Sequence, residues 1–189
     1  DLILKDEKEK LLHQKGVAIW MTGLSGSGKT TIAKGVEKQL YSKGFITQVL
    51  DGDNIRAGIS NNLNFTNEDR EENIRRVAEI SKLFVNCGII TLNSFISPTN
   101  SIREKAKTLI GKENFIEIFI NASIETCEKR DVKGLYEKAR KGNLNNFTGI
   151  SSVFESPKNP DIEVNTTELS INESIKKVVE YILPIIKKK

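Results

Sequence analysis

The chain has few of the residues that build metal centres or disulfide frameworks. Its 189 residues include two cysteines, Cys87 and Cys127, and a single histidine, His13. The spacing of the cysteines fits neither a zinc site nor a disulfide framework, so we expect ordinary buried or half-buried thiols in a reducing compartment. His13 lies in a charged N-terminal stretch, where we expect it to be exposed. Catalysis is therefore expected to use no histidine.

Long apolar runs and a strong excess of one charge are also missing. No apolar run approaches the length of a membrane span and no signal-peptide pattern is present, which predicts a cytoplasmic protein without membrane partners. Because the chain begins at Asp1 rather than Met, an organelle-targeting segment could precede it. The net charge of +4 suits a site for phosphate or sulfate groups and is too weak to indicate nucleic acid. The length predicts a single domain, residues 1–189.

One glycine-rich motif gives the strongest signal. Its residues match G-x-x-x-x-G-K-[ST] and are Gly23, Leu24, Ser25, Gly26, Ser27, Gly28, Lys29 and Thr30. Glycines let the backbone N–H groups close around phosphate oxygens, Lys29 would reach the β- and γ-phosphates, and the Thr30 hydroxyl would bind Mg²⁺. An apolar run over 17–22 precedes the motif and helical apolar spacing follows it over 31–40. This context of strand, loop and helix is the one that a phosphate loop requires.

The rest of the chain predicts an α/β fold of the P-loop type. We expect a three-layer sandwich, with helices flanking a central, mainly parallel five-stranded sheet. The remaining strands are expected at 47–50, 89–95, 115–120 and 161–165, and the main later helices near 67–87, 102–110, 124–129 and from Ser170 or Asn172 onward. Residues 1–15 predict a mobile arm or a short surface helix. Pro184 is expected to kink or end the last helix.

Polar residues follow the predicted second strand. They are Asp51, Asp53, Asn54 and Arg56, and ligands of open parallel sheets bind beyond the carboxyl ends of the strands. Asp51 and Asn54 also suit a helix N-cap, but two carboxylates and an arginine within six residues exceed what a cap needs. We therefore favour a functional role.

A second polar group begins the predicted long helix. Thr66 and Asp69 resemble a capping box, and Phe65 precedes them in a polar loop. Arg70 and Asn73 share one helix face, where they could bind an anion or a base. A solvated charged face is the equally weighted alternative.

The stretch 130–150 departs from the regular pattern. It is basic, carries several glycines and has little apolar periodicity, which predicts a mobile lid bearing Arg130, Lys133 and Arg140. Residues 131–134 also spell the D-x-x-G of a GTPase switch. We discount that motif because no predicted strand ends there and no N-K-x-D guanine motif exists.

Six ordered motifs make residues 10–187 resemble the adenylylsulfate kinase family. They are Gly-Leu-Ser-Gly-Ser-Gly-Lys-Thr at 23–30, Asp-Gly-Asp-Asn-Ile-Arg at 51–56, Asp-Arg-Glu-Glu-Asn-Ile-Arg-Arg at 69–76, Phe-Ile-Ser-Pro at 95–98, Lys-Gly-Leu-Tyr at 133–136 and Phe-Thr-Gly-Ile at 147–150. The resemblance implies transfer of the ATP γ-phosphate to the 3′-hydroxyl of adenylylsulfate, which yields 3′-phosphoadenylylsulfate and ADP in sulfate activation. ATP and Mg²⁺ are the implied cofactors, and a homodimer is the implied assembly.

The resemblance also implies residue roles. The loop residues and Thr31 would hold ATP, with Arg130 on its adenine; Asp51 would orient the acceptor hydroxyl or the metal. Adenylylsulfate would contact Asp53, Asn54, Arg56, Phe65 through stacking, Arg70, Asn73, Ile96 and Ser97, while Lys133, Asn146 and Phe147 would close over it. The implied catalytic set is Lys29, Asp51, Lys133 and Ser97. Ser97 is described as phosphorylated in some members, but direct transfer needs no phosphoserine, so we favour a binding role for it.

The chain departs from the family pattern at positions outside the implied catalytic set, and two other hypotheses are also weighed. Ala57-Gly58-Ile59 stands where the family often has His-Gly-Leu, Thr99-Asn100 where it has Tyr-Arg, Val132 where it has Pro, and Phe154 where it has Tyr. The chain could be another small-molecule P-loop kinase, such as a nucleoside or gluconate kinase. It could also be a non-catalytic nucleotide-binding module, which the intact Lys29, Thr30, Asp51 and Lys133 argue against.

Overall fold

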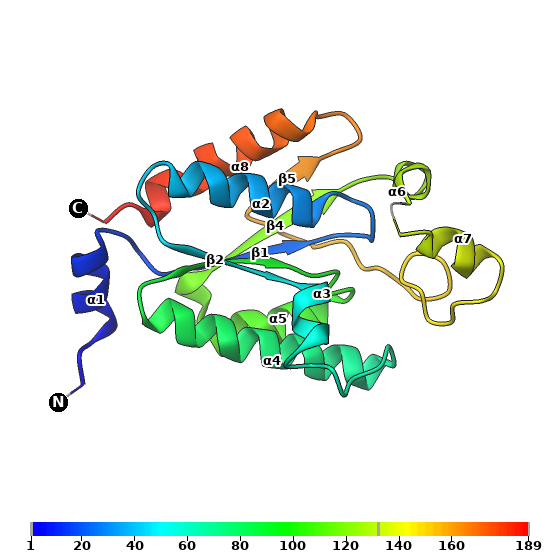
Figure 1. Cartoon of the computed structure of the whole chain (residues 1–189), viewed down its shortest axis with the longest axis horizontal. Coiled ribbons are helices and arrows are strands. Elements are labelled where there is room, and N and C mark those ends of the chain that lie inside the picture. The colour runs from blue at the N-terminus through cyan, green and yellow to red at the C-terminus, as the bar shows by residue number, and fades with distance from the viewer. Residues whose placement is uncertain (1, 132, 189) are drawn as a thin grey trace.

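The computed structural model of the chain describes residues 2–131 and 133–188 (Figure 1). Asp1, Val132 and Lys189 lie outside the described residues. Val132 is the second residue of the discounted D-x-x-G motif, so that position of the motif is not described either. The strands are β1 (Ala18–Thr22), β2 (Thr47–Asp51), β3 (Ile90–Ser94), β4 (Phe115–Asn121) and β5 (Ile162–Asn165). The helices are α1 (Lys5–Leu12), α2 (Lys29–Tyr41), α3 (Gly52–Ala57), α4 (Asn67–Asn86), α5 (Asn100–Ile110), α6 (Ile124–Arg130), α7 (Leu135–Arg140) and α8 (Ile171–Ile186), with a 3₁₀ turn at Lys112–Asn114.

The five strands form one sheet in the order β2-β3-β1-β4-β5, and every neighbouring pair is parallel. The central strand β1 pairs Ala18 with Thr91 on one side and with Phe115 on the other. Because all strands run in one direction, their carboxyl ends meet at one edge of the sheet. Figure 1 shows α3, α6 and α7 at this edge and α1 at the opposite one. The predicted sandwich with a five-stranded sheet is confirmed, and the sheet is wholly parallel.

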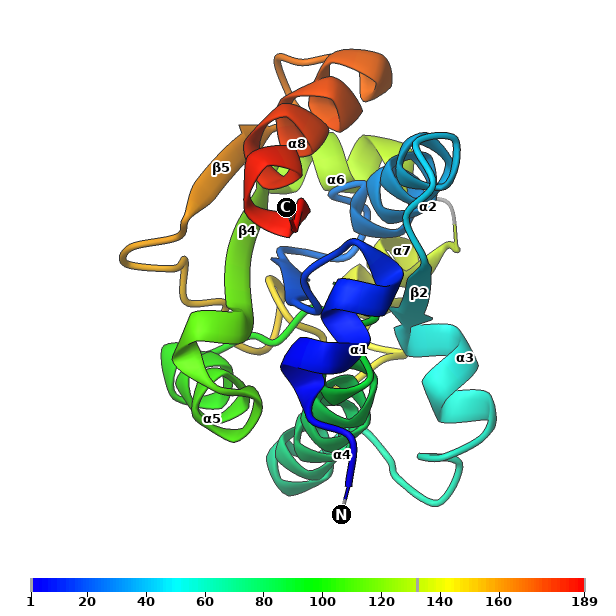
Figure 2. The same ribbon diagram turned by 90° about the vertical axis from the view of Figure 1, so that its left-hand side faces the viewer.

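Helices cover both faces of the sheet, as Figure 2 shows from the end where α1 lies. On one face α2 and α8 bury Val36, Leu40 and Ile182 against the strands. On the other face α4 and α5 enclose Trp20, whose ring stacks on Phe95 and Phe115 at centroid distances of 5.9 and 5.5 Å. Apolar burial on both faces is the main driving force for this arrangement.

A third, smaller apolar cluster lies at the carboxyl edge of the sheet. Its buried members are Ala122, Cys127, Tyr136, Ala139 and Phe147, and Leu24 of the glycine-rich loop packs against them. The predicted lid stretch is therefore attached to the loop through a core of its own.

Several local expectations are confirmed and others need correction. Ser170 caps α8 in a reciprocal capping box with Glu173, so a start at Asn172 is wrong. The Thr66 hydroxyl caps α4, but the Asp69 carboxylate accepts from the Asn64 N–H, so the reciprocal half of that predicted box does not form.

Three further features differ from or refine the expectations. Pro184 does not end α8, which continues to Ile186; a proline this close to a helix end interrupts few backbone hydrogen bonds. Cys127 is buried as expected, whereas Cys87 is exposed because it follows the last residue of α4 on the surface. The N-terminal arm forms the short helix α1, and His13 at its end is exposed.

Candidate active site

The glycine-rich loop connects β1 to α2 at the carboxyl edge of the sheet. Gly23, Gly26 and Gly28 have φ angles of 150°, 77° and 100°, a range that glycine adopts without strain. The backbone also passes too close to its neighbours for side chains, because a Cβ at Gly23 would lie 2.3 Å from the Ile120 carbonyl oxygen. The sequence thus has glycine where the path of the loop demands it.

Lys29 lies inside the loop. Its Nζ donates hydrogen bonds of 2.9 and 2.7 Å to the carbonyl oxygens of Gly23 and Leu24. Burial removes the ammonium group from water and lowers the pKa of Lys29 to about 8, and the charge of Lys133 acts in the same direction. An anion that enters the loop would stabilise the charged form of this buried lysine. The site therefore suits a phosphate ligand.

Thr30 and Asp51 are the predicted metal-site residues. The Thr30 hydroxyl lies 3.0 Å from the Ser94 hydroxyl at the end of β3. In the described part of the chain, no group of three or more His, Cys, Asp or Glu side chains could hold a metal ion. One hydroxyl and one nearby carboxylate fit Mg²⁺ that is held chiefly by nucleotide phosphates and water, rather than a protein cage.

Asp51 has a definite structural role as the N-cap of α3. Its Oδ1 accepts 3.0 Å hydrogen bonds from the backbone N–H groups of Asp53 and Asn54, and its Oδ2 accepts from the Asn54 side chain at 2.9 Å. These hydrogen bonds confirm that Asp51 caps the helix, as the structural alternative predicted. The cap also holds the carboxylate at the carboxyl end of β2, one residue before Gly52 of the cavity wall.

Arg56 and Phe65 form a pair beside α3. The Arg56 guanidinium lies 4.3 Å from the centre of the Phe65 ring and donates to the carbonyl oxygens of Leu63 and Asn64 at 3.2 and 2.9 Å. Phe65 remains 56% exposed, which is a large exposed area for an aromatic ring. The ring is thus fixed by a cation and still accessible to a planar ligand.

Arg70 and Asn73 of α4 both face the same space. Arg70 donates to the Thr148 hydroxyl at 2.6 Å and to the Asn146 carbonyl, so α4 is tied to the predicted lid. Asn73 is 5% exposed, and its Oδ1 accepts no hydrogen bond from the described residues. A buried polar atom without a partner is costly, so this amide is a candidate ligand contact.

Ser97 borders the cavity, but its hydroxyl turns toward the interior. The oxygen accepts a 3.1 Å hydrogen bond from the Trp20 indole N–H, and Ser97 is 2% exposed. Arg103 of α5 holds the same segment: it donates to the Ser97 carbonyl at 2.6 Å and pairs with Glu117 at 2.9 Å. Trp20 and Arg103 were not predicted as site residues, because a buried tryptophan and a helical arginine carry no motif of their own.

Arg130 and Lys133 extend from the predicted lid toward the loop and α3. Arg130 donates to the Gly26 carbonyl at 3.3 Å and to the carbonyl of Thr166 at 2.6 Å, and Lys133 forms an ion pair with Asp53. Thr166 is a further residue without a sequence signal; its hydroxyl donates to the Ser27 carbonyl at 2.8 Å. Arg140 instead pairs with Glu128 at 2.6 Å, away from these groups.

These residues surround one cavity of about 680 Å³. The glycine-rich loop forms one wall, and Arg56, Phe65, Arg70 and Asn73 form another. Predicted site residues that line it are Ser25, Gly26, Ser27, Gly28, Lys29, Thr30, Thr31, Asp53, Arg56, Phe65, Arg70, Asn73, Ile96, Ser97, Arg130, Lys133, Asn146 and Phe147, whereas Gly23, Leu24, Asp51 and Asn54 do not. A chamber with this many cations suits two ligands that carry several negative charges.

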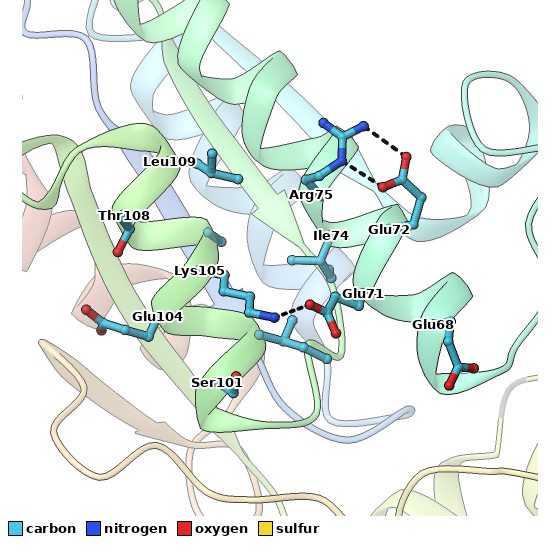
Figure 3. A pocket seen from close by; sticks show the side chains of 12 residues that line it. Glu68, Glu71, Glu72, Ile74, Arg75, Ser101, Glu104, Lys105, Thr108 and Leu109 are labelled. Atoms are coloured by element: carbon cyan, nitrogen blue, oxygen red, sulfur yellow. Dashed lines mark hydrogen bonds and ion pairs between the residues drawn. The ribbon is translucent and has the colours of Figure 1, made fainter.

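A second cavity of about 840 Å³ lies between α4 and α5 (Figure 3). Ile74 and Leu109 contribute to its apolar lining, and Lys105 on α5 points toward Glu71 on α4. None of the predicted site residues lines this cavity. It is separate from the glycine-rich loop.

The loop after the central strand of a parallel sheet, with its buried lysine and cationic chamber, defines a P-loop nucleotide-binding enzyme. The family model described as adenylylsulphate kinase matches residues 15–165. The chain is 55% identical over 188 residues to the adenylyl-sulfate kinase of Bacteroides thetaiotaomicron, covering 100% of this chain and 94% of the relative. It is 50% identical to the adenylyl-sulfate kinase of Clostridium acetobutylicum, and the match covers 95% of this chain and 90% of the relative. The chain belongs to the adenylylsulphate kinase family.

Solved structures agree with this assignment. The Mycobacterium tuberculosis APS kinase CysC in complex with AMPPNP and APS superposes with a TM-score of 0.86 at 41% identity, covering 89% of this chain and 98% of that one. A gluconokinase from Sinorhizobium meliloti superposes with a TM-score of 0.56 at 14% identity, and the match covers 90% of this chain and 93% of that one. At this identity the likeness shows the fold alone. No helix of the described residues is both long and apolar enough to cross a membrane.

Proposed function

We propose that this protein transfers the γ-phosphate of ATP to the 3′-hydroxyl of adenylylsulfate, which gives 3′-phosphoadenylylsulfate and ADP. The observation that carries the proposal is the 680 Å³ cavity, which is lined both by the phosphate loop and by Arg56, Phe65, Arg70 and Asn73. Donor and acceptor can meet there without crossing solvent. Phosphoryl transfer needs mainly positioning and charge neutralisation, which this wall of cations can supply.

ATP binds along the loop in this proposal. Backbone N–H groups from Gly23 to Thr31 surround its phosphates, Lys29 approaches the β- and γ-phosphates, and Arg130 packs on the adenine. The Thr30 hydroxyl would hold Mg²⁺, which would supply positive charge at the transferring phosphate. Lys29→Ala should therefore lose ATP turnover.

Adenylylsulfate binds on the opposite wall. Its adenine stacks on the exposed ring of Phe65, which Arg56 holds in place. Arg70 and Asn73 bind the phosphosulfate and ribose; the unpartnered Oδ1 of Asn73 supports this role. Asp53, Asn54, Ile96 and Ser97 complete the acceptor pocket.

Asp51 orients the acceptor hydroxyl or the metal, and as a carboxylate it can accept the hydroxyl proton. Lys133 adds positive charge to the transferring group, and Asn146 and Phe147 close the chamber from the lid, 130–150. The existing contacts of Lys133 with Asp53 and of Arg70 with the lid support this arrangement, because they already connect the lid to the acceptor wall. We place the lid and the P-loop core in one domain.

Coupled ADP release tests the proposal. ATP·Mg²⁺ is supplied with adenylylsulfate, or with adenosine 5′-monophosphate or gluconate as control acceptors. We expect turnover with adenylylsulfate at micromolar concentration and none with the controls. Turnover with gluconate would favour another small-molecule P-loop kinase, and ATP binding without turnover on any acceptor would favour a non-catalytic module.

We also propose a cytoplasmic homodimer, without nucleic acid or membrane partners. The family resemblance supports the dimer, and exposed apolar side chains on the N-terminal arm, including Leu2, Leu4 and Leu11, offer surface for association. Light scattering after size-exclusion chromatography tests it. A mass equal to one chain would contradict it.

A further inference from the structure

Tyr136 connects the predicted lid to the phosphate loop through one hydrogen bond. Its hydroxyl, on α7, donates to the backbone carbonyl of Ser25 at 2.8 Å, and the side chain is 2% exposed. Ser25 is the third residue of the loop. None of the roles assigned above uses Tyr136.

This bond engages the carbonyl of the peptide group between Ser25 and Gly26. No cis peptide bond occurs among the described residues, and in a trans peptide the C=O and N–H groups point to opposite sides. When Tyr136 holds the Ser25 carbonyl, the N–H of Gly26 points away from Tyr136. A phosphate loop requires its N–H groups to converge on the anion, so this direction decides whether Gly26 contributes a donor.

Sterics alone do not fix this peptide. Gly26 has a φ of 77°, and glycine populates positive and negative φ about equally, so the peptide between Ser25 and Gly26 can rotate at low cost. A larger residue cannot remove this freedom, because a Cβ at Gly26 would lie 3.0 Å from the Cys127 carbonyl oxygen. The restraint must come from a contact such as the Tyr136 bond.

The position of Tyr136 depends in turn on the lid. Its ring packs edge-on against Phe147 at a centroid distance of 4.9 Å, in the same apolar cluster as Leu24 of the loop. The residues on both sides of Phe147 accept hydrogen bonds from Arg70, which belongs to the acceptor wall. A continuous set of contacts therefore runs from Arg70 to the Ser25 carbonyl.

We infer that Tyr136 is a positioning residue that directs the Gly26 N–H toward the phosphates of ATP when the lid packs against the loop. The inference rests on the proposed function for the identity of the nucleotide. Tyr136 also borders the 680 Å³ cavity, and in this inference its hydroxyl acts through the Ser25–Gly26 peptide.

Tyr136→Phe in the full chain tests this, because it removes the hydroxyl and keeps the ring. Calorimetry with AMPPNP should show binding weakened roughly fivefold, the effect of one net hydrogen bond. The KM for adenylylsulfate at saturating ATP should stay within twofold of the unaltered protein. The downfield shift that AMPPNP is expected to cause at the Gly26 amide in nitrogen-15 NMR spectra should shrink. Tyr41→Phe is the matched control, since Tyr41 is 79% exposed on α2 and should behave as the unaltered protein.

Two results in solution would overturn the inference. One is unchanged AMPPNP affinity with an unchanged Gly26 shift in Tyr136→Phe. The other is a lowered melting temperature with equal losses for AMPPNP and adenylylsulfate, which indicates a purely structural role. AMPPNP binding requires no acceptor, so a wrong acceptor assignment would leave this test intact. A crystal structure of the variant should show the Ser25–Gly26 peptide in more than one orientation, and a single unaltered orientation would also count against the inference.

Discussion

The guanidinium of Arg70 on α4 donates a hydrogen bond of 2.6 Å to the hydroxyl of Thr148, 78 residues further along the chain. Arg70 also bonds the Asn146 carbonyl, so one acceptor-wall side chain holds the predicted lid at two points. This contact gives the first prediction. Thr148→Val removes the acceptor hydroxyl at similar volume and should loosen the lid.

Limited trypsin digestion measures that loosening, because Arg140 and Lys141 on the lid are exposed cleavage sites. We expect faster cleavage there in Thr148→Val, by roughly fivefold for one lost net hydrogen bond. Thr108→Val, at an exposed position on α5, is the control. Trypsin should cleave the lid of this variant at the same rate as in the unaltered protein. Equal lid cleavage in all three proteins would mean that Arg70 does not restrain the lid.

Lys29 predicts a specific pH dependence of nucleotide binding. Burial lowers its pKa to about 8, whereas a bound phosphate favours the ammonium form. Below that pH the cation is already present; above it, binding must take up a proton. Affinity for Mg·ADP should therefore fall as pH rises through about 8, by at most about tenfold per pH unit.

Calorimetry in buffers of different ionisation enthalpy detects the proton uptake directly. Lys29→Arg is the control, since its guanidinium stays charged and should give a flatter profile. A flat affinity profile for the unaltered protein across this range would show that Lys29 does not titrate near pH 8.

Phe65→Ala should mainly weaken the binding of the acceptor, adenylylsulfate. Base stacking on an aromatic ring contributes about 1–3 kcal/mol, so the KM for adenylylsulfate should rise roughly fivefold or more, with little change for ATP. Ile59→Ala is a suitable control, because Ile59 is 54% exposed in the same region but lines no part of the cavity. If Phe65→Ala left the KM for adenylylsulfate unchanged, the stacking assignment would be wrong.

Lys133→Met should lower kcat without lowering the stability of the fold. The Lys133–Asp53 pair is exposed, so its loss should hardly change the melting temperature. If Lys133 supplies charge to the transferring group, kcat should fall roughly 100-fold, as for other lost electrostatic contacts in transition states. Lys138→Met, on the exposed surface of α7, serves as the control. An unchanged kcat would remove Lys133 from the catalytic set.

Ser97→Ala distinguishes a catalytic hydroxyl from a structural one. The hydroxyl accepts from the buried Trp20 N–H, so its removal should lower the free energy of unfolding by about 1–3 kcal/mol. Most of kcat should remain if Ser97 only borders the pocket. Denaturant unfolding and steady-state kinetics measure the two effects. Loss of kcat at unchanged stability would restore Ser97 to the catalytic set.

The fold class, the phosphate loop and the family could all be predicted from the sequence. These depend on local patterns: glycines whose φ angles only glycine tolerates, apolar runs that must be buried, and a motif in which every residue is adjacent in the chain. The position of Lys29 followed directly, because the loop between β1 and α2 places it. Arg56 was predicted with the polar residues after the second strand, and Phe65, Arg70 and Asn73 with the start of the long helix; the structure places both groups around one cavity.

The hydrogen-bond partners of these residues could be identified only from the folded chain. Asp51 caps α3, the Ser97 hydroxyl bonds to Trp20, and Tyr136 reaches Ser25 across 111 residues of sequence. The direction of a side chain and the satisfaction of a buried polar group depend on contacts between distant segments, which local patterns do not encode. Whether Cys87 is exposed and whether Arg103 supports the Ser97 segment were settled for the same reason, by the packing of helices against the sheet.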